Sequence, residues 1–146
     1  MSGEASRKEP GEHRIVVGVD GSECATRALD FAAEEAYRTG AVLHIVSVCS
    51  VTPAAGMIVS TSVLDEPAAR DIVRQASERV LERRPGVVTK AESVLGAVGP
   101  ILVEVSKDAE LLVVGTRGHS QIAGLLLGSV SEYAVHHAHC TTTVVR

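Results

Sequence analysis

The stretch GTRGHSQIAGLLLGS, residues Gly115–Ser129, places glycines at positions 115, 118 and 128 between an apolar run and a segment of helical character. The apolar run is Leu111–Val114, and the helical segment extends from Ser129 to about His139. The run predicts a buried strand, and the glycines mark the turn from that strand toward the helix. Because glycine lets another group approach the main chain closely, this turn is a candidate binding loop.

Outward from this stretch, strand patterns alternate with helix patterns along the chain. The expected strands are Arg14–Asp20, Val42–Val48, Val87–Leu95, Leu111–Val114 and Thr141–Val145, and the expected helices start near Ser22, Pro67, Gly99 and Ser129. Ser22 offers an N-cap hydroxyl to the first helix, Gly40 ends that helix, and Pro85-Gly86 ends the second. Residues 49–65 have no regular pattern but are fairly apolar, so we expect them to fold over another part of the molecule.

Alternation of strands and helices predicts an α/β fold with a mostly parallel sheet and helices on both faces. The first and fourth strands are the most continuously apolar and belong in the centre, whereas the third and fifth carry Ser and Thr and belong at the edges. The strand order 3-2-1-4-5 satisfies this, which is a doubly wound, Rossmann-like arrangement. In such sheets ligands bind outside the carboxyl ends of the strands where the winding reverses, here between strands one and four.

Length and composition indicate one globular domain over residues 14–146, preceded by a polar, mobile tail over residues 1–13. The net charge of −4 disfavours nucleic acid as a partner. No apolar run approaches the ~20 residues that a membrane-spanning helix needs, and the tail lacks the apolar core of a secretory signal. Three widely spaced cysteines argue against a disulfide framework, so the cytoplasm is the expected compartment.

The glycine loop is suited to phosphate, because the first turn of the helix that follows it presents unpaired N–H groups to an anion. The sequence contains neither GxxxxGK[ST] nor a GxGxxG motif after the first strand, so it supports neither a P-loop nucleotidase nor a dinucleotide dehydrogenase. A loop whose glycines serve only turns is the alternative interpretation.

The loop glycines and Ser129 match the pattern G-x2-G-x9-G-[S/T]. Together with VGVDGS at 17–22, VVGTRG at 113–118 and LLLGSVSE at 125–132, this pattern resembles the ATP-binding branch of the universal stress protein family. The likeness runs from Arg14 to Arg146. It implies the five-stranded doubly wound fold, ATP as ligand, and magnesium bound with the nucleotide.

The resemblance assigns five residues to the nucleoside end of the ligand. Asp20, at the end of the first strand, would lie near the ribose or near phosphate-bound magnesium. Val48 would meet adenine through its backbone, Val114 and Gly115 would line the nucleoside, and Gly18 would leave room.

Four further residues are assigned to the phosphates. Gly118, Gly128, Ser129 and Val130 would bind them through main-chain N–H groups, with the Ser129 hydroxyl at the N-cap position. Arg117 carries a charge that would suit the phosphates, but an exposed arginine before a glycine is more often solvated.

The resemblance implies a nucleotide-dependent stress-response regulator or sensor. No lysine follows the loop and no base is positioned for water, so any ATP hydrolysis should be slow or should depend on a partner. Three alternatives stay open: a cyclic AMP-binding member of the same family, an enzyme that uses ATP, and a protein-interaction module whose loop is empty.

Thr141–Val145 is an expected edge strand with no later element to cover it. Two copies of such a strand can pair antiparallel across a twofold axis, and relatives dimerise in this way, so a homodimer is expected. A monomer whose edge is blunted by threonines is the alternative.

The segment HHAHC, residues 136–140, suggests a metal site, because His136, His139 and Cys140 would share a helix face. Neighbouring residues of one segment surround a zinc ion poorly, and histidines at the end of a helix complement its dipole. We therefore expect no metal there. No spacing in the sequence identifies a Ser-His-Asp triad.

Overall fold

A computed structural model describes residues 13–49, 52–54, 57–59, 65–116 and 127–146. Its elements are β1 (Arg14–Gly18), α1 (Glu23–Thr39), β2 (Val42–Cys49), β3 (Thr52–Ala54), β4 (Met57–Val59), α2 (Glu66–Arg83), β5 (Thr89–Leu95), α3 (Val98–Val105), β6 (Leu111–Gly115), α4 (Ser129–His137) and β7 (Thr141–Val145). None of the helices in these ranges combines the length and apolarity needed to cross a membrane.

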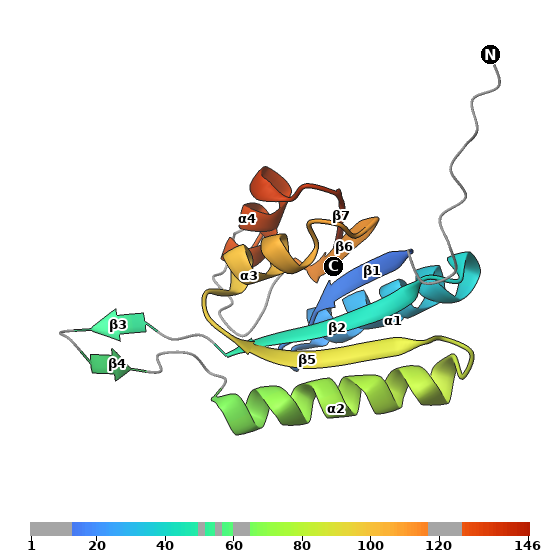
Figure 1. Ribbon diagram of the computed structural model, residues 1–146, viewed down its shortest axis with the longest axis horizontal. Helices are drawn as coiled ribbons and strands as arrows, with labels where there is room; N and C mark the ends of the chain where they lie inside the picture. Colours follow the sequence, from blue (N-terminus) through green and yellow to red (C-terminus); the bar gives the residue numbers. More distant parts are fainter. Residues whose placement is uncertain (1–12, 50–51, 55–56, 60–64, 117–126) are drawn as a thin grey trace, which may run out of the picture.

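Five strands form one parallel sheet in the order β5-β2-β1-β6-β7, which confirms the predicted order 3-2-1-4-5 (Figure 1). The two most apolar strands, β1 and β6, are neighbours in the middle, and β5 and β7 are the edges. The winding therefore reverses between β1 and β6, as expected.

Helices cover both faces of this sheet (Figure 1). Val17 and Ile45 point to the face where α1 and α2 pack, and Val16 and Val46 point to the face where α3 and α4 pack. Because β1 and β2 are buried on both faces, their sequences are continuously apolar over several residues instead of alternating.

Local signals at the helix ends are confirmed in α1. The Ser22 hydroxyl accepts a hydrogen bond from the Ala25 N–H at 3.3 Å, and Gly40 ends the helix with φ 73°. At α2, the N-cap is Asp65, whose carboxylate accepts from the Ala68 N–H at 2.8 Å. These caps fix where both helices begin, and with them the loops at the carboxyl edge of the sheet.

Both ends of α4 differ from the prediction. Its N-cap is Gly128, which has no side chain to cap the helix, so Ser129 is the first helical residue and not the N-cap. The helix ends at His137, because Ala138 is extended with φ −61° and ψ 143°. His139 and Cys140 therefore lie outside the helix and do not share a face with His136.

Part of the stretch 49–65, predicted to be irregular, forms strands. Thr52–Ala54 pairs antiparallel with Met57–Val59 as a two-stranded sheet. The closure of this stretch over another part of the molecule stays a prediction, because its connecting residues lie outside the described ranges.

Candidate functional site

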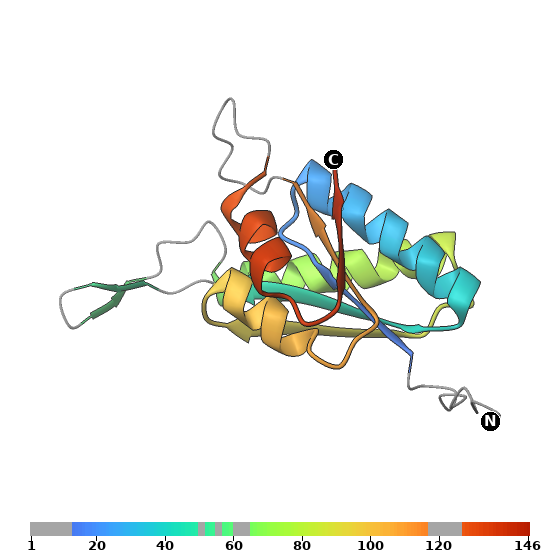
Figure 2. The ribbon, with the colours of Figure 1, turned by 90° about the horizontal axis from the view of Figure 1, so that it is seen from above.

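The site is built where β1 and β6 end side by side. α1 follows β1 on one face of the sheet, and α4, which comes after β6, packs on the other (Figure 2). The two chain segments therefore diverge at the carboxyl edge, which is the position of the ligand-binding crevice in open α/β sheets. Asp20, Gly115 and Gly128 all lie at this edge.

Asp20 heads the loop between β1 and α1. Its Oδ1 accepts a hydrogen bond from the Ser22 N–H at 2.9 Å, and Gly21 adopts φ 80°, a left-handed conformation that favours glycine. Ser22 then caps α1. The DGS segment is thus a tight turn that holds a half-buried carboxylate at the end of β1.

Val48 lies one residue before the end of β2, and its side chain is buried. The ladder between β1 and β2 ends with Gly18 opposite Val46, after which the Val19 N–H donates to the Val46 carbonyl at 2.9 Å. Successive residues of a strand direct their N–H and C=O groups to alternate sides, so those of Val48 face the same side as those of Val46. They are directed past the end of β1, toward the crevice.

Two glycines of the predicted site face protein atoms. A Cβ at Gly115 would lie 2.9 Å from the backbone carbon of Cys24 and 3.1 Å from the Ala25 nitrogen, so the first turn of α1 packs against the Gly115 backbone. A Cβ at Gly18 would lie 2.8 Å from Cδ1 of Leu102 on α3. In this structure both glycines make room for helices that pack on the sheet.

The start of α4 is bonded to the residue after β6. The Gly128 N–H donates to the Thr116 carbonyl at 2.6 Å, and the Ser131 hydroxyl lies 3.2 Å from the same oxygen. With the Gly128 N–H engaged, the first-turn amides without an acceptor within the helix include those of Ser129 and Val130. These two N–H groups carry the positive end of the helix dipole.

Sequence reasoning missed Thr116 and Ser131, which are both buried polar residues. Thr116 directly follows the apolar strand, and Ser131 is the third residue of α4. The sequence indicates these residues only as a small polar residue at each position. Such residues are common in sequences, so they do not identify a site. Of the other predicted loop residues, Gly118 and Arg117 lie outside the described ranges.

The histidines of HHAHC do not gather into a metal site. His136, His137 and His139 are exposed, and the His137 ring lies against the Tyr133 ring with centroids 4.2 Å apart. Within the described ranges, no group of three or more His, Cys, Asp or Glu side chains is arranged to hold a metal ion.

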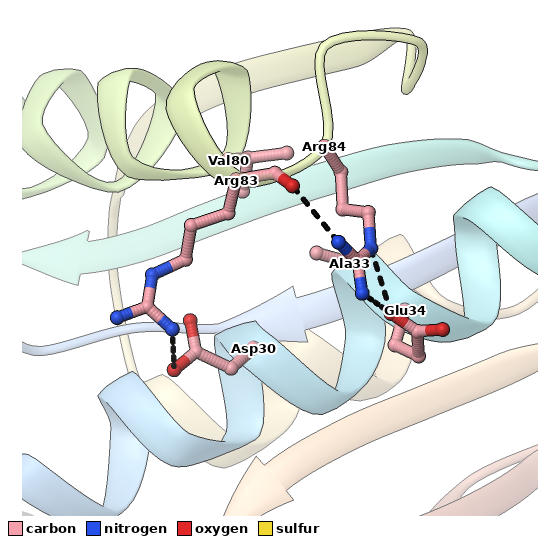
Figure 3. A pocket seen from close by; sticks show the side chains of 6 residues that line it. All are labelled: Asp30, Ala33, Glu34, Val80, Arg83 and Arg84. Carbon is pink, nitrogen blue, oxygen red and sulfur yellow. Dashed lines mark hydrogen bonds and ion pairs between the residues drawn. The ribbon is translucent and has the colours of Figure 1, made fainter.

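A hollow lies between α1 and α2 (Figure 3). Its volume is about 350 Å³, and its lining residues are Asp30, Ala33, Glu34, Val80, Arg83 and Arg84. Arg79 donates two hydrogen bonds of 2.8 Å to the Asp30 carboxylate, which hold the pKa of Asp30 below its usual value against the opposing effect of burial. Arg84 pairs with Glu34 in the same way across the two helices. These charges compensate one another and join α1 to α2.

The fold and the crevice can be compared with known proteins. The model of the universal stress protein family matches residues 12–146. The chain belongs to the universal stress protein family. The family membership that the resemblance implies is thereby confirmed.

Among curated universal stress proteins, Rv2624c of Mycobacterium tuberculosis is 34% identical over 148 residues, which cover 100% of this chain and 52% of that protein. Universal stress protein Rv1996 of the same species is 32% identical over 149 residues, covering 90% of this chain and 47% of that protein. The chain thus spans about half the length of the curated relatives it matches.

Solved universal stress proteins share the fold. One from Archaeoglobus fulgidus superposes with a TM-score of 0.74 at 27% identity, covering 92% of this chain and 98% of that one. A universal stress protein in complex with cAMP is 31% identical, with a TM-score of 0.69 and coverage of 92% and 97%. A universal stress protein from A. fulgidus in complex with dAMP is 25% identical, with a TM-score of 0.70 and coverage of 92% and 98%.

Proposed function

We propose that this chain binds an adenine nucleotide, ATP in the first place, in the crevice between β1 and β6. The observation that carries the proposal is the start of α4, where the N–H groups of Ser129 and Val130 have no acceptor in the helix and lie at the carboxyl edge of the sheet. Phosphate is the anion that such a helix end accommodates best. The complexes of similar proteins with cAMP and dAMP support adenosine phosphates as the ligand class.

The nucleoside is assigned to the strand ends beside this helix. The backbone of Val48 supplies an N–H and a C=O for the adenine edge, and Val114 and Gly115 supply the end of β6 for the sugar. Val114 is only 2% exposed, so its direct contact with the ligand would be small. Asp20 is the residue to which we assign the ribose hydroxyls.

Magnesium fits this site as a companion of the nucleotide. Magnesium prefers oxygen ligands and is commonly held by one or two carboxylates together with the phosphates. Asp20 offers a carboxylate at the carboxyl edge of the sheet. The described residues provide no larger cluster of acidic or imidazole ligands. We assign Asp20 as the protein group nearest to such an ion, whose chemical role would be to neutralise phosphate charge.

The chain is proposed to act as a nucleotide-dependent regulator or sensor in stress responses. The two lysines in the described ranges, Lys90 and Lys107, lie on edge strand β5 and after the end of α3, so neither is at the crevice. A site that binds phosphates mainly with neutral amides, and to which the described residues bring no lysine, should hold the ground state without strongly stabilising a transition state. Turnover of ATP should therefore be slow.

Isothermal titration with ATP, ADP and cyclic AMP, with and without magnesium, tests the proposal. We expect ATP to bind with a Kd on the order of micromolar, because several charge-assisted bonds to amides suffice for that affinity. Competition between ATP and cyclic AMP for a labelled analogue decides which is preferred. Absence of binding by all three at millimolar concentration contradicts the proposal.

A substitution at the start of α4 localises the site. Gly128 has φ −76° and ψ 168°, which a side chain tolerates, so Gly128→Val keeps the backbone allowed while placing methyl groups at the phosphate position. ATP affinity should fall at least tenfold, and Gly118→Val in the same loop should add to the loss. Gly86→Val is the matched control, because a Cβ at Gly86 meets only Tyr37, at 4.0 Å. Unchanged ATP affinity in a folded Gly128→Val, Gly118→Val double variant contradicts this placement.

We also propose that two copies pair through β7. Of the two sheet edges, β5 carries the charged residues Lys90 and Glu92, whereas β7 has the sequence TTTVV and carries no charge. Charges on an edge strand oppose pairing with another strand. The uncharged edge is therefore the one suited to a second copy of this chain.

A further inference from the structure

Ser131 is a buried serine whose hydroxyl links α4 to the end of β6. The residue is 1% exposed, and its Oγ lies 3.2 Å from the Thr116 carbonyl oxygen and 3.0 Å from the Gly128 carbonyl oxygen. A hydroxyl has one proton, so it shares that proton between the two acceptors or alternates between them.

The same Thr116 carbonyl also holds the N-cap residue. The Gly128 N–H donates to it at 2.6 Å, while the Thr116 N–H donates to Val145 of β7 at 2.8 Å. Thr116 is thus fixed to the sheet and serves as the anchor for the start of α4. Gly128 has no side chain with which to cap the helix, so Ser131 is the side chain that performs this attachment from within the first turn.

We propose that Ser131 is a positioning residue for phosphate binding, an inference that rests on the nucleotide-binding function proposed above. Its hydroxyl is directed inward to Thr116 and is not available to a ligand. It acts by fixing the first turn of α4 against β6, so that the N–H groups of Ser129 and Val130 keep their direction toward the phosphates. Preorganised amides bind an anion without a further ordering cost.

The first measurement needs no nucleotide. Amide hydrogen exchange at Gly128 reports the bond to Thr116, and Ser131→Ala should raise this exchange rate about tenfold by loosening the attachment. Ser106→Ala is the matched control, because Ser106 is also a buried helix-end serine, with its hydroxyl 3.2 Å from the Val103 carbonyl. The control should leave Gly128 exchange unchanged.

The second measurement compares ATP with adenosine, which lacks phosphates. Ser131→Ala should weaken ATP binding about fivefold to tenfold, as expected for one hydrogen bond, and adenosine binding by less than twofold. Ser106→Ala should change neither. Ser131→Cys also lacks the hydroxyl but keeps the side-chain volume, and it should behave like Ser131→Ala. This variant separates the loss of the hydrogen bond from a change in packing.

Two outcomes overturn the inference while leaving the proposed function intact. One is an unchanged Gly128 exchange rate in both Ser131 variants. The other is an equal loss of ATP and adenosine affinity, which is the result of a purely structural role. Failure of the wild-type protein to bind any adenine nucleotide instead overturns the proposed function, and the exchange measurement still decides whether Ser131 holds the helix start.

Discussion

His44 is a buried histidine on β2 with one satisfied ring nitrogen. It is 1% exposed, its Nε2 lies 2.8 Å from Oε1 of Glu92 on β5, and its Nδ1 has no partner among the described residues. Burial lowers the pKa of His44 below its usual value, the neighbouring Glu92 partly opposes this shift, and Lys90 and Arg14 add to it. The folded protein therefore keeps this imidazole neutral under conditions where the unfolded chain protonates it.

This predicts a loss of stability in mild acid. Because the folded-state pKa lies below the unfolded value of about 6.5, the unfolded state binds more protons as the pH falls below that value. The free energy of unfolding should decrease from pH 7 toward pH 5, by at most about 1.4 kcal/mol per pH unit from this group. Urea unfolding at several pH values measures this, and His44→Leu should flatten the dependence.

The same replacement at exposed His136 is the control for removing an imidazole from the chain. His136→Leu should keep the wild-type dependence on pH. A wild-type slope that persists unchanged in His44→Leu would show that other groups cause it.

Individual residues of the site were predictable where a motif fixes them and not where tertiary contacts do. Asp20 and Val48 are placed at the carboxyl edge because each stands at the end of an apolar strand, a feature visible in the sequence. The roles of Thr116 and Ser131 arise only when β6 and α4 are brought together across the loop between them. No sequence pattern around Thr116 or Ser131 indicates that they are in contact.

Among the elements, β6 and α1 make a close backbone contact within the site. This contact explains why residue 115 is a glycine, because the first turn of α1 occupies the space that a side chain would need. From the sequence alone, a ligand and a packed helix are indistinguishable as the group that approaches a glycine. The helix starts were easier to predict, since Ser22 and Gly40 act through bonds within a few residues of the chain.

Gly115→Ala tests this contact. The added Cβ would meet backbone atoms of Cys24 and Ala25 at 2.9 and 3.1 Å, and backbone moves aside less readily than a side chain. We expect the free energy of unfolding to fall by about 1–3 kcal/mol, the usual cost of overpacking. Urea denaturation followed by circular dichroism measures the change.

Gly86→Ala is the matched control, because its added Cβ would have no neighbour closer than 4.0 Å. Its effect should stay within about 0.5 kcal/mol. Equal stability of the two variants would mean that α1 shifts freely away from β6.

At the scale of the whole molecule, the sheet has two unlike edges. The strand order was predictable because the apolar content of each strand ranks it from centre to edge. The hairpin of β3 and β4 was not, because its two strands have three residues each and such short segments carry no usable period. The difference in charge between β5 and β7 leads to a prediction about assembly.

Thr142→Pro should convert a dimer into a monomer. The Val145 carbonyl accepts from the N–H of Thr116, the residue after β6, so by strand alternation the N–H of Thr142 faces the open side of β7. Proline removes this outward donor while leaving the bonds to β6 in place. Sedimentation equilibrium should show two copies for the wild-type chain and one for the variant.

Thr142→Val keeps the N–H while losing the hydroxyl, which lies 3.5 Å from the Cys140 carbonyl, so it should remain dimeric. If the wild-type chain sediments as a monomer, the proposed pairing through β7 is wrong. A dimeric Thr142→Pro variant would show that the copies meet elsewhere.

The charges on β5 have a consequence for how far such assembly can proceed. Once two sheets have joined at their uncharged borders, the resulting ten-stranded body exposes only the borders that carry Lys90 and Glu92. Further addition would then have to bury ionised groups, so the proposed dimer should not grow into a filament.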